Sequence, residues 1–233
     1  MNERISIDTP DGSFGVYVAR PTAGSAPAPA IVVIQEIFGI NADMRAHCDA
    51  LAAKGFIALC PDLFWRLEAG IELSDKTPEE WQQAMGLYKR FDLDKGVDDV
   101  AATLAAARAL PGANGKVGVM GFCMGGLLTY LTAMRTGADA AVAYYGGRSE
   151  QFLGEMGGLP TPLMMHLGEA DEYIPPPARQ AIVSAAAAVP SVKIFTYPGQ
   201  NHAFARVDGS HFNAGAAALA NERTEAFFAE HLK

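Results

Sequence analysis

Short runs of consecutive apolar residues recur along the chain and restrict its fold more than any other feature. The run Ala30–Ile34 is too short for a helix and carries no polar side, so it predicts a strand that is covered on both faces. Comparable strands are predicted at Phe56–Cys60, Lys116–Met120, Ala138–Tyr145, Pro162–Leu167 and Val192–Tyr197. Strands of this kind belong to parallel sheets flanked by helices, so the sequence predicts an α/β fold.

Helical segments alternate with these strands. They are predicted from a cap at Asn41 to Lys54, at Pro78–Phe91 and Lys95–Leu110, in a run that follows residues 121–126 and ends at Thr136, and at Pro177–Val189 and Ala214–His231. This alternation predicts a mostly parallel, doubly wound sheet flanked by helices. Two extended stretches, Arg4–Ile7 and Phe14–Ala19, surround a Pro-Asp-Gly turn and predict an antiparallel hairpin at the N-terminus. No linker or internal repeat interrupts the pattern, so residues 1–233 are predicted to form a single domain.

Charge and cysteine content narrow the classes of partner. The formal net charge is −8 without a basic block, which argues against nucleic acid and anionic membranes as partners. The N-terminal sequence lacks the basic and apolar regions of a secretory signal. Three cysteines, without paired Cys or His at short spacing, are typical of reduced thiols rather than disulfides or a metal site. We therefore expect a monomeric cytoplasmic protein that acts on a small molecule and uses no metal or other cofactor.

The sequence G-F-C-M-G at residues 121–125 carries the most specific chemical signal. It has the G-x-S-x-G pattern of a nucleophile elbow, with Cys123 in place of serine, between a predicted strand and a predicted helix. The glycines leave room for a strained turn, and the N-terminus of a helix favours a thiolate. A buried structural cysteine in a tight turn is the alternative. Cys48 and Cys60 lack this context and are expected in the core.

An α/β-hydrolase requires an acid and then a histidine after the nucleophile. Asp171 follows the strand Pro162–Leu167, and Glu169 and Glu172 are its rivals in the same loop. We favour Asp171 because a short carboxylate beyond the glycine-containing turn suits a fixed histidine partner.

His202 follows the last predicted strand and precedes the closing helix, which is the expected place for the base. His211 is its competitor, and His166 is expected to be a core histidine because it lies within a strand. His202 would take the thiol proton and later protonate the leaving oxygen, while Asp171 fixes the tautomer.

Backbone N–H groups are expected to stabilise the developing oxyanion. One belongs to Met124, directly after the nucleophile, and the other to Ile37, in the loop after Ala30–Ile34. Glu36 in the same loop is unfavourable beside an oxyanion unless it has a partner, and a solvated strand-end glutamate is the alternative.

With these residues, the chain resembles the dienelactone hydrolase family (carboxymethylenebutenolidase). The resemblance runs over nearly the whole chain and rests on Q-E-I-F-G-I-N at 35–41, the cysteine elbow with Gly126, Y-Y-G at 144–146, H-A-F-A-R at 202–206 and A-A-L-A-N-E-R at 217–223. It implies that Glu36 contacts and modulates the thiol, that Arg206 binds a substrate carboxylate, and that Tyr145 belongs to the substrate site. It also implies the reaction, in which water opens dienelactone (4-carboxymethylenebut-2-en-4-olide) to maleylacetate.

One position departs from the family. Trp81 stands where the best-known members carry a second carboxylate-binding arginine, and it could stack on a ligand or pack into the core. Arg66 on the preceding loop is a candidate to replace the missing cation. The sequence therefore leaves open a hydrolase of a different small ester or lactone, and also a non-catalytic binder of an acidic metabolite.

Overall fold

The computed structural model of the protein describes residues 2–22, 27–158 and 161–233. Its strands follow the hydrogen-bonded order β1-β2-β4-β3-β5-β6-β7-β8. Internal contacts divide the chain into two units, residues 1–119 and 120–233. No helix in the described part of the chain is both long and apolar enough to cross a membrane.

The first unit begins with the predicted hairpin. Strands β1 (Asn2–Thr9) and β2 (Gly12–Ala19) pair antiparallel, with Thr9 opposite Gly12 at the turn. Strand β2 continues antiparallel to β4 (Ile57–Pro61), and β4 lies parallel to β3 (Ala28–Ile34). Every residue of β3 and β4 is buried, as the continuous apolar runs predicted.

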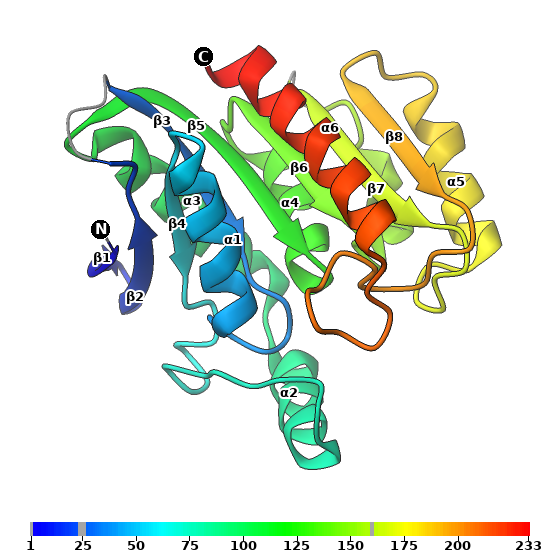
Figure 1. Ribbon diagram of the computed structural model, residues 1–233, viewed down its shortest axis with the longest axis horizontal. Helices are drawn as coiled ribbons and strands as arrows, with labels where there is room; N and C mark the ends of the chain where they lie inside the picture. The colour runs from blue at the N-terminus through cyan, green and yellow to red at the C-terminus, as the bar shows by residue number, and fades with distance from the viewer. Residues whose placement is uncertain (1, 23–26, 159–160) are drawn as a thin grey trace. The chain divides into compact units, whose positions relative to one another are not determined.

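Three helices of this unit begin at side-chain caps. The side chain of Asn41 accepts a hydrogen bond from the backbone N–H of Met44 and so caps α1 (Ala42–Ala53). Thr77 and Asp92 cap α2 (Pro78–Arg90) and α3 (Leu93–Ala109) in the same way. Helices α1 and α3 both pack on β3 and β4, and in Figure 1 they lie on opposite faces of these strands.

The long connection from β4 to α2 is tied down by polar contacts. The Gln35 side chain accepts a hydrogen bond from the backbone N–H of Leu63 at 3.1 Å. Gly39 forms an isolated antiparallel bridge with Glu72, and a Cβ at Gly39 would lie only 1.8 Å from the carbonyl oxygen of Ile71. The loop after β3 is therefore held between the two ends of this connection.

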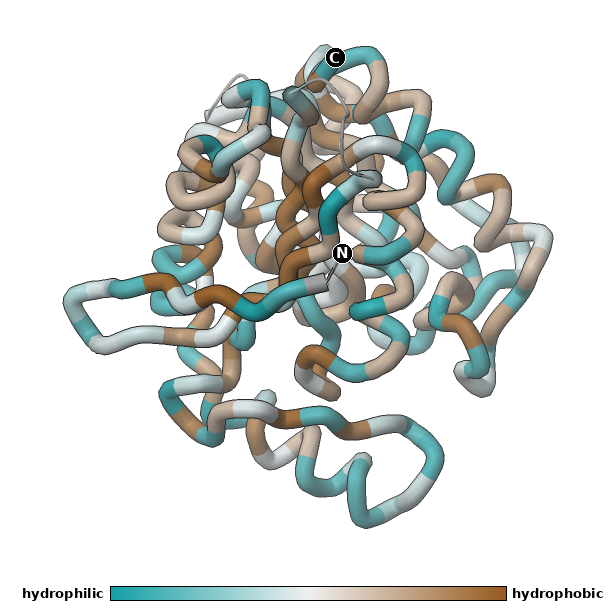
Figure 2. The backbone as a smooth tube through the Cα atoms, turned by 60° about the vertical axis from the view of Figure 1, so that its left-hand side comes forward, coloured by the Kyte–Doolittle hydropathy of each residue, from teal (hydrophilic) through white to brown (hydrophobic). Residues whose placement is uncertain are grey.

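The second unit contains a parallel sheet with helices around it. Its elements are the end of β5 (Ala113–Phe122), α4 (Met124–Arg135), β6 (Ala140–Tyr144), the 3₁₀ helix η1 (Ser149–Glu155), β7 (Leu163–Gly168), α5 (Pro176–Ala186), β8 (Val192–Tyr197) and α6 (Ala214–Leu232). Strand β7 pairs in parallel with both β6 and β8. Strands β6 and β7 are fully buried. Figure 2 shows hydrophobic stretches of backbone alternating with hydrophilic ones along the chain.

Two features differ from the sequence prediction. Strand β5 begins at Ala113, three residues before the predicted strand Lys116–Met120. Its first residues are partly or fully exposed, so they carry no apolar signal. The short helix η1 was not predicted either, because at seven residues it is too short to show a hydrophobic period.

A buried hydrogen-bond network joins α6 to the sheet of the second unit. His166 is fully buried, and its Nδ1 and Nε2 lie 2.8 Å from the Tyr197 hydroxyl and 3.1 Å from the Thr224 hydroxyl. The Tyr144 hydroxyl lies 2.6 Å from the same Thr224 oxygen. Burial lowers the pKa of His166 to about 3, so it is a neutral core histidine as expected.

Candidate active site

Cys123 occupies a strained turn between the end of β5 and the start of α4. Its φ of 54° and ψ of −114° lie in a region that non-glycine residues rarely adopt. Its backbone N–H donates to the carbonyl oxygen of Tyr144 at 3.1 Å, which ties the turn to the end of β6. The N–H of Met124 belongs to the first turn of α4, where N–H groups have no intrahelical partner.

The glycines around Cys123 are required by close backbone contacts. A Cβ at Gly121 would lie 2.3 Å from the carbonyl oxygen of Gly125, and a Cβ at Gly126 would lie 2.3 Å from that of Tyr144. Such distances are shorter than any non-bonded contact allows, so a Cβ is excluded at both positions.

Gly126→Ala is expected to lower the free energy of unfolding by about 1–3 kcal/mol, the usual range for overpacking. The new methyl would push on the Tyr144 carbonyl that holds Cys123, so activity should fall together with stability. Urea unfolding measures the change in unfolding free energy.

The matched control is Gly86→Ala in α2, where a Cβ meets nothing within 4 Å. That change should stabilise by about 0.5–1 kcal/mol. Equal stability of the two variants would contradict the contact at Gly126.

Asp171 and His202 form a buried pair between two loops of the second unit. The imidazole Nδ1 lies 2.9 Å and 3.1 Å from the two carboxylate oxygens, and both side chains are buried. Of the rival carboxylates, Glu169 and Glu172 are exposed. The backbone N–H of Tyr173 donates to Asp171 Oδ1 at 2.8 Å and fixes the acid in its loop.

The loop of His202 is also braced. His211 Nδ1 lies 3.1 Å from the backbone carbonyl of His202, and the backbone N–H of His202 donates to the Asn201 side chain at 2.7 Å. The competitor His211 therefore supports the His202 loop.

The environment of His202 favours its charged form. Burial by itself would lower the pKa of the imidazole, but negative charge on Cys123 and hydrogen bonds to Asp171 and Cys123 outweigh burial and raise this pKa from 6.5 to about 10. At neutral pH the imidazole is therefore protonated.

The raised pKa predicts how stability depends on pH. Because the folded protein holds the His202 proton more tightly than the unfolded chain, the charged imidazole contributes its full stabilisation below pH 6.5 and loses it as the pH rises through about 10. We expect the difference in unfolding free energy between wild type and His202→Gln to shrink between these limits. Urea unfolding of both proteins across this range tests it, and a constant difference would contradict the assignment.

Two tyrosine rings flank His202. Tyr145 is fully buried, and its ring centroid lies 5.2 Å from that of His202 in an edge-on arrangement. Tyr173, which the sequence analysis missed, lies on the loop that carries Asp171. Its ring centroid is 4.7 Å from that of His202. It stands two residues after Asp171, which is the signal that could have identified it.

In the first unit, the loop after β3 is buried. Glu36 and Ile37 are 2% and 4% exposed, and the Gln35 side chain holds this loop against the residues after β4. Trp81 on α2 is half-buried, with its ring centroid 5.8 Å from that of Phe38 in the same loop. Trp81 therefore packs on the loop that carries Glu36.

Arg66 does not replace the missing cation. Its guanidinium pairs with Asp99 and Asp11 and stacks on Trp65 at 4.3 Å, so it is committed to structural contacts within the first unit. Arg206 follows His202 in a turn in which its backbone N–H donates to the carbonyl of Ala203 at 3.0 Å, and its side chain is partly exposed.

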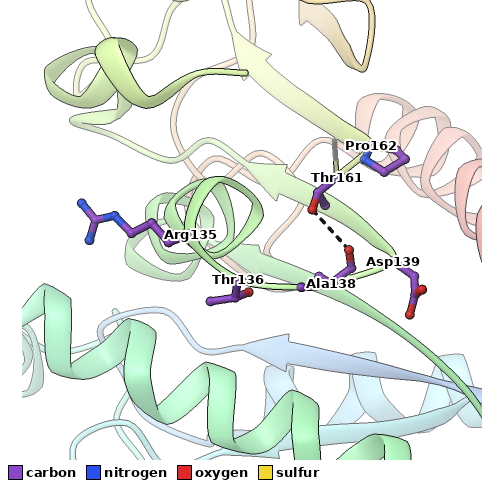
Figure 3. Close-up of a pocket in the computed structure, with 7 residues that line it drawn as sticks. Arg135, Thr136, Ala138, Asp139, Thr161 and Pro162 are labelled. Carbon is purple, nitrogen blue, oxygen red and sulfur yellow. Dashed lines mark hydrogen bonds between the residues drawn. The ribbon is translucent and has the colours of Figure 1, made fainter. Parts of the chain in front are cut away.

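The second unit also contains a cavity of about 500 Å³ that lies away from Cys123, Asp171 and His202. It is lined by residues that include Arg135, Ala138, Thr161 and Pro162, which precede β6 and β7 (Figure 3). Cys123, Asp171 and His202 all follow strands, so this cavity lies at the opposite strand ends and is separate from the candidate site.

A strained residue between a strand and a helix, followed along the chain by a paired aspartate and histidine, defines the α/β-hydrolase class. The family model of the dienelactone hydrolase family matches residues 14–232. The chain belongs to the dienelactone hydrolase family, and it is an ester or lactone hydrolase.

Relatives support the same family. The chain is 41% identical to the carboxymethylenebutenolidase of Pseudomonas putida over 98% of this chain and 97% of that protein. It is 46% identical to an Azospirillum brasilense protein provisionally named carboxymethylenebutenolidase, over 95% of each. A crystal structure from Klebsiella pneumoniae, provisionally named a dienelactone hydrolase, aligns with a TM-score of 0.87 at 26% identity, covering 99% of this chain and 98% of that one.

Proposed function

We propose that this chain is a cysteine-dependent hydrolase that opens dienelactone to maleylacetate, with Cys123 as nucleophile, His202 as acid and base, and Asp171 as the orienting carboxylate. The observation that carries the proposal is the position of His202, which hydrogen-bonds to Asp171 through Nδ1 and interacts with the thiol of Cys123. A single imidazole between a carboxylate and a sulfur at a strained turn is suited to acyl transfer and is not needed for simple binding.

In the proposed reaction, the Cys123 thiolate attacks the lactone carbonyl carbon and forms a tetrahedral intermediate. The bond from that carbon to the ring oxygen then breaks, and protonated His202 donates its proton to the leaving oxygen. This gives a thioester and the enol of the ring-opened product. His202, now neutral, removes a proton from water, whose oxygen attacks the thioester carbon. Loss of the thiolate gives the carboxylic acid, which releases its proton to water, and restores the starting pair. Tautomerisation of the enol then gives maleylacetate.

Other residues are proposed to assist these steps. The backbone N–H groups of Met124 and Ile37 would bind the oxyanion, and Glu36 would modulate the thiol. Arg206 would bind the substrate carboxylate, with Trp81 and Tyr145 completing the substrate site. The buried position of Glu36 supports a specific role rather than that of a solvated glutamate.

A different small ester or lactone is the second candidate. It is favoured by Trp81, which packs on Phe38 and supplies no cation at a position where the family's best-known members have one. We further propose that residues 1–233 act as one domain, as a monomer, in the cytoplasm and without a cofactor. A silent binder of an acidic metabolite is disfavoured because it would not need the Cys123–His202 pair.

The experiment that tests the nucleophile is limited alkylation with iodoacetamide and peptide mass analysis. Cys123 should react at least about tenfold faster than the other thiols, because it is partly exposed beside a base. Cys48 and Cys60 are buried, and burial with a hydrogen bond to Cys60 raises the pKa of the Cys48 thiol. The Cys123→Ala variant is the control for site identity. If alkylation of Cys48 or Cys60 came first and left activity intact, the nucleophile assignment would be wrong.

Labelling with and without a lactone also tests the proposed role of Glu36, because a Cys123 thiol held by Glu36 should react faster when substrate is present.

A further inference from the structure

Tyr173 lies at the candidate site for a local structural reason. Its backbone N–H donates to Asp171 Oδ1 at 2.8 Å, and the next residue, Ile174, is fully buried and anchors the loop. The loop that fixes the acid therefore also fixes the direction of the Tyr173 side chain.

The Tyr173 ring meets the base edge-on and remains accessible. Its centroid lies 4.7 Å from that of His202, with an interplanar angle of 71°. Tyr145, which meets His202 at 5.2 Å, is completely buried, whereas Tyr173 is 49% exposed. Of the two rings against His202, Tyr173 is thus the one with a free surface beside the reacting groups.

Nearby charges place the phenol close to the other proposed functional residues. Burial raises the pKa of Tyr173 most, and negative charge on Glu172 and Cys123 adds to this effect. The positive charge of Arg206 acts in the opposite direction. The Tyr173 phenol therefore lies within electrostatic range of Cys123, the proposed nucleophile, and of Arg206, which is proposed to bind the substrate carboxylate.

The surrounding loops expose further apolar surface. Among the described residues, the exposed large hydrophobic side chains are Tyr173, Val207, Phe212 and Leu219, and the first three lie on the two loops that carry Asp171 and His202. Single exposed apolar residues are common, but three on these two loops indicate an apolar margin at the site.

We infer that Tyr173 is a substrate-contacting residue, whose exposed ring packs against the substrate beside His202 and selects flat, conjugated lactones over saturated ones of the same size. This inference rests on the proposed function. A flat π-system offers a face to an aromatic ring, whereas a puckered saturated ring cannot make an equally close contact.

The test compares 2(5H)-furanone with γ-butyrolactone, a flat and a saturated lactone of the same ring size. In Tyr173→Leu, the ratio of kcat/KM for the flat to the saturated lactone should fall about three- to tenfold, mainly through KM, as expected for loss of an aromatic contact. Tyr173→Phe should keep the ratio. Where turnover is too slow to follow, the Ki of each lactone against p-nitrophenyl acetate hydrolysis gives the same ratio.

Controls separate the possible outcomes. Leu219→Ala removes another exposed large hydrophobic side chain, from helix α6 and outside the two loops of the site, and should leave the ratio unchanged. Thermal unfolding verifies folding, and Tyr173→Met replaces the leucine variant if that one is unfolded. Equal losses on both lactones would mean that Tyr173 only positions Asp171 and His202, and an unchanged ratio would also overturn the inference. A Cys123→Ala variant that remained active would instead refute the proposed function.

Discussion

Replacing Cys123 or His202 by alanine is expected to reduce turnover by a factor on the order of 10⁴ or more, and the double variant should be little worse than either single one. The reason is that the two side chains act as one unit: without the thiol nothing attacks, and without the imidazole nothing protonates the leaving oxygen. Steady-state hydrolysis of a lactone and of p-nitrophenyl acetate measures these losses. Multiplicative losses in the double variant would contradict a shared role.

Asp171→Asn belongs to the same experiment and should cost less than the loss of His202, because the base remains while its orientation and charge stabilisation are weakened. Glu169→Gln and Glu172→Gln are the matched controls, since both carboxylates are exposed and lie within two residues of Asp171. A larger effect from either control than from Asp171→Asn would show that the wrong acid has been assigned.

Arg206→Ala is expected to lower kcat/KM for dienelactone by about ten- to a hundredfold, the usual consequence of losing one charge-assisted hydrogen bond. Hydrolysis of the neutral ester p-nitrophenyl acetate should hardly change, because that ester has no carboxylate to bind. Kinetics on these two substrates measure the effect. Equal losses on both would indicate that Arg206 is structural, through the turn in which its N–H donates to Ala203.

Trp81→Arg extends this experiment. Adding a cation at that position should increase the preference for the carboxylated substrate over the neutral ester if the side chain reaches the bound carboxylate. Trp81→Phe is the matched control, because it keeps an aromatic ring against Phe38 and adds no charge. An unchanged preference in Trp81→Arg would mean that Trp81 serves only to pack on the loop after β3.

The sequence by itself determined the element order, because its local signals were strong. The apolar runs of β3 and β7 are buried along their whole length, and Asn41 caps α1 as its position before a helical segment indicates. The glycines of the elbow were also readable in advance, because a tight strand–helix turn excludes a Cβ at Gly121 and Gly126. What a residue type can do within its own turn or strand is a local property, and sequence patterns record it.

Only the tertiary structure decided which side chains meet across distant segments. It brings Asp171, rather than Glu169 or Glu172, to His202, and it commits Arg66 to Asp99 and Asp11. It also places Tyr173 edge-on against His202, a contact that the position of this tyrosine two residues after Asp171 does not fix by itself. The physical reason is that such contacts depend on the register of neighbouring strands and the path of the loops between them, and both are set by packing of the whole sheet rather than by neighbours in the chain.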